Sequence, residues 1–182
     1  MVNNPDNLPI LQRGEPILAQ VASAIEDINS HEIKQLISNL KVTMQNAGGV
    51  GIAAPQVGVS LRVFLMASAP SERYPNAPLL PLTVVINPSI INKNSLQELD
   101  WEGCLSVKGK RAQVSRYTCI EVKFQDETGK KHHQTLNGFI ARIFQHELDH
   151  LDGITFIERL NHEADVINEQ QWLEQTQITE AR

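Results

Sequence analysis

The pattern of apolar and polar residues indicates first an amphipathic helix in the N-terminal third of the chain. Between residues 30 and 46, apolar side chains recur every three or four positions, as on one face of an α-helix. This apolar stripe consists of Ile33, Leu36, Ile37, Leu40 and Met44. Ser30 or Asn29 can cap its first turn, and Gly48 can end it. The preceding residues 1–28 lack such periodicity and are expected to wrap the surface as an irregular segment.

Three further segments have the composition of β-strands, namely LRVFLMA (61–67), LTVVINP (82–88) and TCIEVKF (118–124). The turn DETGK and the polar segment HHQT follow the third of these, which predicts a β-hairpin. Between the first two, residues 70–81 contain four of the nine prolines, so an internal strand is excluded there. We expect an ordered excursion there.

A second helix is predicted from Asn137, as its N-cap, to about Leu151, with Gly153 as its stop. Residues 158–182 then form a polar, acidic tail that can contain a further helix. Its inward-facing apolar residues are expected to be Val166, Ile167 and Leu173. With 182 residues and no repeat or linker, the chain fits a single α+β domain spanning 1–182.

Composition narrows the classes of function. The chain has 16 basic and 21 acidic residues, so its net charge of −5 does not suggest broad binding to nucleic acids or anionic membranes. No apolar run approaches the ~20 residues that span a bilayer. The first residues, MVNNPDNLPILQRGEP, resemble neither a signal peptide nor a transit peptide. Two cysteines are too few for a disulfide framework, which favours free thiols and a cytoplasmic protein.

His146, Glu147 and His150, in QHELDHL, carry the clearest chemical signal. Helical positions i and i+4 lie roughly 5–6 Å apart on one face, so both imidazoles can reach one metal ion. Glu147 lies about 100° further around the helix, which suits a group that handles a metal-bound water. These letters can occur by chance on a surface helix. Phe139 and Ile143 nevertheless continue the histidine stripe with apolar residues, which a solvated face would not show.

The third metal ligand remains open on the residues alone. A histidine or glutamate downstream is usual in metalloproteases, and His162 and Glu163 are candidates. Cys104, in WEGCLSV, competes with them, although by itself it could equally be an inert buried thiol. Cys119 lies in an alternating segment and is expected to be a small buried hydrophobic residue.

Three motifs together resemble the signature of the peptide deformylases: GVGIAAPQ (49–56), EGCLS (102–106) and QHELDHLDG (145–153), in the family's order. The resemblance extends from about residue 8 to 160. Residues 70–81 look like an insertion seen in some branches of the family, which would shape one wall of the substrate cleft. It implies an α+β fold with mixed or antiparallel sheets packed around a central metal-binding helix. It also implies a metal-dependent hydrolase that removes the formyl group from the N-terminal formyl-methionine of newly synthesised polypeptides.

The resemblance also implies residue roles. The metal ligands would be Cys104, His146 and His150. A metal-bound water would be the nucleophile, with Glu147 as general base and acid. The Gln56 side chain and the Leu105 backbone N–H would stabilise the oxyanion. The implied substrate-binding residues are Gly49, Val50, Gly51, Glu102, Gly103, Phe139 and Ile143.

The ion implied by the family is usually Fe²⁺, with Zn²⁺, Ni²⁺ or Co²⁺ as possible occupants, and the ligand set alone also fits zinc. N-formyl-Met peptides of nascent chains would be the substrates, and the family default is a monomer. Some deformylases end in a basic helix thought to dock on the ribosome. Residues 158–182 instead hold six acidic residues and two arginines, so no such anchor is expected, although transient ribosome contact remains open.

Four side chains near the motifs have expected structural roles. An ion pair of Glu102 with Arg116 would stiffen the cysteine loop. Asp149 and Asp152 are interpreted as ordinary helix-end acids, with support of a metal ligand as the alternative for Asp149. The glycines at 48, 49 and 51 would allow an extended peptide to pair with this segment as an added strand.

Three other functions are compatible with parts of the pattern. The first is a zinc endopeptidase with His162 or Glu163 as third ligand. The second is a cysteine amidase with Cys104 as nucleophile, whose activity would survive chelation. The third is a non-enzymatic binding protein with a structural metal held by four protein ligands.

Overall fold

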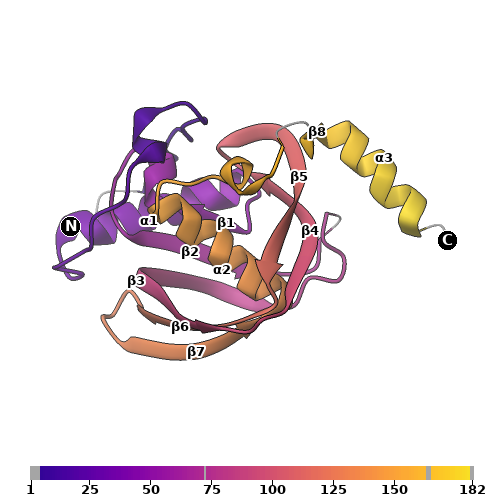
Figure 1. Ribbon diagram of the computed structural model, residues 1–182. Helices are drawn as coiled ribbons and strands as arrows, with labels where there is room; N and C mark the ends of the chain where they lie inside the picture. Colours follow the sequence, from indigo (N-terminus) through magenta and orange to yellow (C-terminus); the bar gives the residue numbers. More distant parts are fainter. Residues whose placement is uncertain (1–4, 72, 163–164, 181–182) are drawn as a thin grey trace.

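The protein, described here from a computed structural model, consists of antiparallel strands in two sheets with a helix between them (Figure 1). The structure describes residues 5–71, 73–162 and 165–180, the last five of these by their backbone alone. The five-stranded sheet has the order β1 (Gly51–Ala53), β2 (Val63–Ser68), β3 (Leu80–Lys93), β6 (Cys119–Gln125) and β7 (Lys131–Asn137). The three-stranded sheet has the order β4 (Gln97–Cys104), β5 (Val107–Tyr117) and β8 (Ile167–Asn168). The expected α+β class is confirmed.

In the part of the chain that the structure describes, three α-helices accompany the sheets, and each was anticipated from the sequence. They are α1 (His31–Asn46), α2 (Gly138–Leu151) and α3 (Glu169–Glu180). Three short 3₁₀ helices have both ends within the described residues: η1 (Pro16–Ala19), η2 (Ala54–Val57) and η3 (Phe156–Arg159). No helix in the described part of the chain is long and apolar enough to cross a membrane.

The five-stranded sheet is covered by a helix on each face because side chains alternate along its strands. Phe64 and Val85 pack with Phe144 of α2, and the rings of Phe64 and Phe144 meet edge to face at 5.2 Å. Leu65 points to the other face, where it packs with Leu40 of α1. Burial of such a side chain contributes about 1.5–3 kcal/mol. The resulting double core fixes α2 against β1 and β2.

The predicted ends of α1 and α2 are confirmed, but only α1 has the expected cap. The Ser30 hydroxyl accepts a hydrogen bond from Ile33 N at 3.3 Å, and the predicted apolar stripe of α1 is buried. Asn137 precedes α2, yet its side chain makes no capping hydrogen bond. The chain instead enters α2 directly from β7, and Gly138 N donates to Thr118 O at 2.8 Å.

Three expectations about exposed and buried residues need correction. Cys119 is half-buried, not a core residue, because it opens β6 at the margin of the sheet. Leu173 is 44% exposed, and its neighbour Trp172 is the buried residue of α3. Residues 5–28 are irregular as expected, but Leu18, Ala22, Ile25 and Ile28 anchor them in the core.

Candidate metal centre and cavity

Cys104, His146 and His150 come together at the meeting point of β4 and α2. Cys104 is the last residue of β4, and the two histidines lie one helical turn apart on α2. The candidate ligand atoms of the three residues all lie within 4.8 Å of one another, with Cys104 Sγ 3.1 Å from His150 Nε2. His162 is not in this group, and Glu163 lies outside the described residues.

The surroundings of Cys104 favour its thiolate form, and those of His146 fix the orientation of its ring. Burial raises the pKa of the Cys104 thiol, but the imidazoles of His150 and His146 outweigh that effect and lower the pKa to about 5. The thiolate is the form that binds metals. His146 Nδ1 lies 2.9 Å from a carboxylate oxygen of Glu102, which leaves Nε2 of the ring for a ligand.

Glu102 belongs to a buried ionic network that supports His146. Its carboxylate accepts hydrogen bonds from Arg116 at 2.8 and 2.9 Å and from Arg142 at 2.9 Å. Burial opposes ionisation of Glu102, but the bonds from Arg116 and His146 hold its pKa well below the ordinary value. The expected pair of Glu102 and Arg116 is therefore confirmed, and it also fixes the orientation of a histidine.

Asp149 extends the same network, and its interpretation as an ordinary helix-end acid is wrong. The side chain is only 7% exposed, and Arg116 binds it at 2.6 Å. Arg159 of η3 donates to it at 2.5 and 3.0 Å. Asp149 thus holds Arg116 in place, and Arg116 in turn holds Glu102. Asp152, the other predicted helix-end acid, is exposed and forms an ion pair with Arg62 at 2.8 Å.

Glu147 faces the other side of the site, against the backbone of β1. Burial raises its pKa to about 7, and its Oε2 has no hydrogen-bond partner among the described residues. A side chain on Gly51 would overlap the Glu147 carboxylate. The glycine is therefore required for this close packing, and its φ angle is ordinary.

Gln56 is held so that its amide nitrogen faces the cysteine loop. Its Oε1 accepts from Ala53 N at 2.8 Å, while Nε2 donates to Ser106 Oγ at 3.1 Å and lies 3.6 Å from Cys104 Sγ. The loop is also fastened by Gln12, whose side chain donates to Leu105 O at 3.1 Å. Sequence reasoning missed Ser106 and Gln12. Only Ser106 carried a signal, as the last letter of EGCLS.

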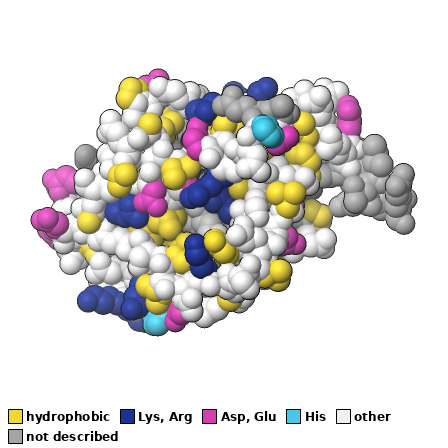
Figure 2. Space-filling view, in the orientation of Figure 1, with side chains coloured by type: hydrophobic (Ala, Val, Ile, Leu, Met, Phe, Trp, Pro, Cys, Tyr) yellow, Lys and Arg dark blue, Asp and Glu magenta, His cyan; other side chains and the backbone are white. Residues whose placement is uncertain are grey.

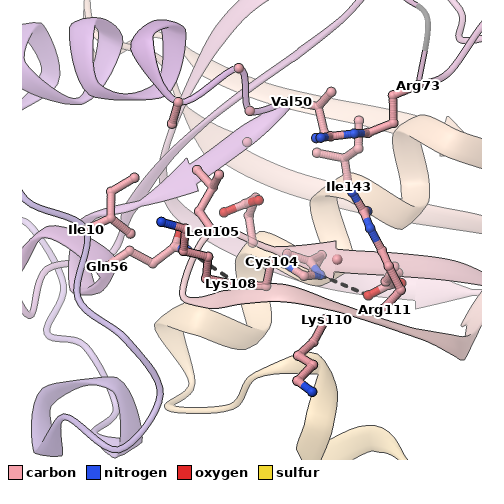
Figure 3. Close-up of a pocket in the computed structure, with 18 of the residues that line it drawn as sticks. Ile10, Val50, Gln56, Arg73, Cys104, Leu105, Lys108, Lys110, Arg111 and Ile143 are labelled. Atoms are coloured by element: carbon pink, nitrogen blue, oxygen red, sulfur yellow. Dashed lines mark hydrogen bonds and ion pairs between the residues drawn. The ribbon is translucent and has the colours of Figure 1, made fainter. Parts of the chain in front are cut away.

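A cavity of about 680 Å³ opens beside these residues (Figure 3). Figure 2 shows hydrophobic side chains inside a central hollow and basic side chains around it. The seven expected substrate-binding residues all line the cavity: Gly49, Val50, Gly51, Glu102, Gly103, Phe139 and Ile143. Tyr74 of the proline-rich excursion also lines it, with its ring 5.0 Å from that of Phe139. The excursion therefore does form part of the cavity wall.

Comparison with known proteins gives a consistent result. The polypeptide deformylase family model matches residues 7–166. The chain belongs to the polypeptide deformylase family. It is 48% identical to peptide deformylase 2 of Nostoc sp. over 94% of this chain and 96% of the relative. It is 50% identical to peptide deformylase 2 of Shewanella oneidensis over 84% of this chain and 83% of that one.

Solved deformylase structures share the fold. A Met-Ala-Ser-bound class I type b peptide deformylase from Acinetobacter baumannii has a TM-score of 0.82 at 44% identity, over 84% of this chain and 98% of that one. An actinonin complex of the Synechococcus elongatus deformylase has a TM-score of 0.77 at 33% identity, over 91% of this chain and 84% of that one. The prediction of a deformylase enzyme is confirmed, and the zinc endopeptidase is not supported.

Gly51→Ala is expected to destabilise the deformylase fold by about 1–3 kcal/mol, because the added methyl group overlaps Glu147. Denaturant unfolding measures this loss. In a Glu147→Ala background the same change should cost much less, because the overlapping atoms are gone. Equal costs in both backgrounds would contradict the packing.

Proposed function

We propose that this chain hydrolyses the formyl group from N-formyl-Met peptides with a divalent ion held by Cys104, His146 and His150. The main support for this proposal is that the ligand atoms of these three residues lie within 4.8 Å of one another. Beside them is the buried carboxylate of Glu147, whose Oε2 has no hydrogen-bond partner among the described residues. A thiolate and two imidazoles form a set suited to Fe²⁺, Zn²⁺, Ni²⁺ or Co²⁺. Fe²⁺ is our first choice, on the family resemblance.

The donor set fits a catalytic metal better than a structural one. Structural zinc sites usually have four protein ligands, whereas catalytic sites have three and keep one position open. Among the described residues, three meet here. When bound, the ion would supply a Lewis acid that makes water nucleophilic near neutral pH.

Glu147 is the group that moves protons in this proposal. A carboxylate with a pKa of about 7 can accept a proton from the attacking water and return it to the departing amine at neutral pH. Its position against Gly51 places it beside the strand that would hold the substrate. Its carboxylate is confined by that contact, which limits the geometries it can adopt.

Gln56 and Leu105 would stabilise the negative charge that develops on the formyl oxygen. Such donors are effective when they are fixed before the reaction, because no reorganisation is then needed. Ala53 N and Ser106 fix the Gln56 amide, and the Gln12 side chain fastens the Leu105 carbonyl.

Substrate binding would use the edge of β1 and the cavity beside it. β1 pairs with β2 on one side and is an edge strand of its sheet, so an extended peptide could add to the other side. Val50, Phe139 and Ile143 would then surround the methionine side chain. A single domain, a monomer, a cytoplasmic location and transient ribosome contact remain predictions.

Glu102→Gln is expected to weaken metal binding by roughly 10–100-fold, because it removes the negative partner of His146 Nδ1. Competition with a chelator measures the affinity. Glu98→Gln is the matched control, since Glu98 lies on the same strand with an exposed side chain. An unchanged affinity in Glu102→Gln would contradict the supporting role.

Hydrolysis of paired peptides tests the proposed reaction. Formyl-Met-Ala-Ser is expected to yield formate and free Met-Ala-Ser, whereas acetyl-Met-Ala-Ser is expected to remain intact. Mass spectrometry of the products distinguishes this outcome from cleavage inside the peptide, which would contradict the proposal and indicate an endopeptidase.

A further inference from the structure

Four basic side chains line the cavity and have no role in the chemistry described so far, namely Arg73, Lys108, Lys110 and Arg111. Arg73 comes from the proline-rich excursion, and Lys108 and Arg111 come from β5. We call these three residues the cationic rim. Figure 3 shows them on the cavity wall, while the side chain of Lys110, which also lines the cavity, points away from these three and is not included in the rim.

Arg111 is held by several segments of the fold. Its side chain is only 6% exposed and donates to Glu169 at 2.9 Å and to the Tyr74 hydroxyl at 3.2 Å. Its guanidinium lies over the Trp172 ring at 4.7 Å, and a side chain on Gly103 would overlap it. The Nε of Arg111 has no hydrogen-bond partner among the described residues. A buried, fixed guanidinium thus retains an unused donor.

The rim carries more positive charge than its neighbours neutralise. Glu169 is shared between Arg73 at 3.2 Å and Arg111 at 2.9 Å, so one carboxylate serves two guanidiniums. Lys108 is exposed and forms no ion pair within the described part of the chain. Glu102, which also lines the cavity, is already paired with arginines at 2.8 and 2.9 Å. This local excess is opposite in sign to the net charge of −5.

We propose that the cationic rim is a subsite for acidic side chains in the residues that follow formyl-methionine. The inference rests on the proposed function. An extended peptide advances about 3.3 Å per residue, so a chain anchored between Val50 and Ile143 passes the rim within a few residues. Guanidinium groups bind carboxylates through paired, charge-assisted hydrogen bonds, and an ammonium adds a point charge. The proline-rich excursion contributes through Arg73 and through Tyr74, which bonds Arg111.

The test compares three C-terminally amidated peptides, formyl-Met-Ala-Glu-Glu, formyl-Met-Ala-Gln-Gln and formyl-Met-Ala-Lys-Lys, with the metal-loaded full-length protein. At low ionic strength, kcat/KM for the Glu peptide is expected to exceed that for the Gln peptide by on the order of tenfold. The Lys peptide should be the poorest substrate. Added salt should reduce the differences, because it screens charges near the surface.

Two variants assign the preference to the rim. In Arg73→Gln/Lys108→Gln the ratio of Glu to Gln peptide should fall towards one. Lys130→Gln/Lys131→Gln removes the same charge at an exposed site on the β6–β7 hairpin and should keep the ratio. If the first variant does not fold, Lys108→Glu serves instead, and the preference should shift towards the Lys peptide.

The possible failures are distinguishable. If the Gln peptide is not deformylated at all, the proposed function fails. If the Gln peptide is deformylated but the Glu peptide is no better, only the subsite is overturned. A preference for acidic residues that persists unchanged in both rim variants would also overturn the subsite.

Discussion

Glu147→Gln is expected to lower kcat for formyl-Met peptides by roughly 10²–10⁴-fold while the bound metal is retained. Glutamine has the shape of glutamate but cannot accept and return a proton. Glu147 is buried against Gly51 and is not among the three converging ligand residues. The loss should therefore appear in kcat, with metal content unchanged by elemental analysis.

A matched control for this change is Glu174→Gln on α3, where the side chain is exposed. It should keep both kcat and metal content. A Glu147→Gln protein that retained its kcat would remove Glu147 from the reaction. One that lost its metal would instead make Glu147 part of the ligand set.

Cys104→Ser is expected to weaken metal binding by more than roughly 100-fold, the upper range for loss of a group that only supports a ligand. The thiolate of Cys104 has a pKa of about 5 and is available at neutral pH, whereas a serine hydroxyl stays protonated. Dialysed Cys104→Ser protein should contain almost no metal and release almost no formate.

The control for the cysteine is Cys119→Ser. Cys119 is half-buried on β6 and is not one of the converging residues, so its replacement should leave metal content at the level of the parent protein. Full metal content in Cys104→Ser would refute the ligand set. In that case the third ligand would have to come from elsewhere, as in the endopeptidase alternative.

The local sequence pattern was sufficient to predict the helices and strands in which apolar residues recur periodically. The stripe around Leu40 predicted α1, and the alternation in residues 118–124 with the turn after it predicted β6 and β7. The long hairpin of β4 and β5 was missed. The exposed first half of β4 is polar at Gln97, Glu98 and Asp100, so the strand carries little apolar signal, and its partner strand decides its structure.

The three proposed metal ligands and the proposed proton-moving carboxylate were accessible from motifs, whereas the residues that support them were not. Arg116 is 14 residues from Glu102 and 33 residues from Asp149 in the sequence, so only folding brings the three side chains together. The apolar signal of α3 was assigned to Leu173 although Trp172 is the buried residue. Which of the two residues is buried depends on the packing of Trp172 under the Arg111 guanidinium, a tertiary contact that the local pattern does not reveal.

The most direct test of the metal-dependent reaction is formate release from formyl-Met-Ala-Ser by anaerobically purified protein, before and after chelation, with metal content measured in parallel. The expected result is about one divalent ion per chain, formate release that disappears with the ion, and recovery when Fe²⁺ or Ni²⁺ is restored. Formate release that continues undiminished after the metal has been removed would contradict the assignment of Cys104, His146 and His150 and indicate Cys104 as a nucleophile.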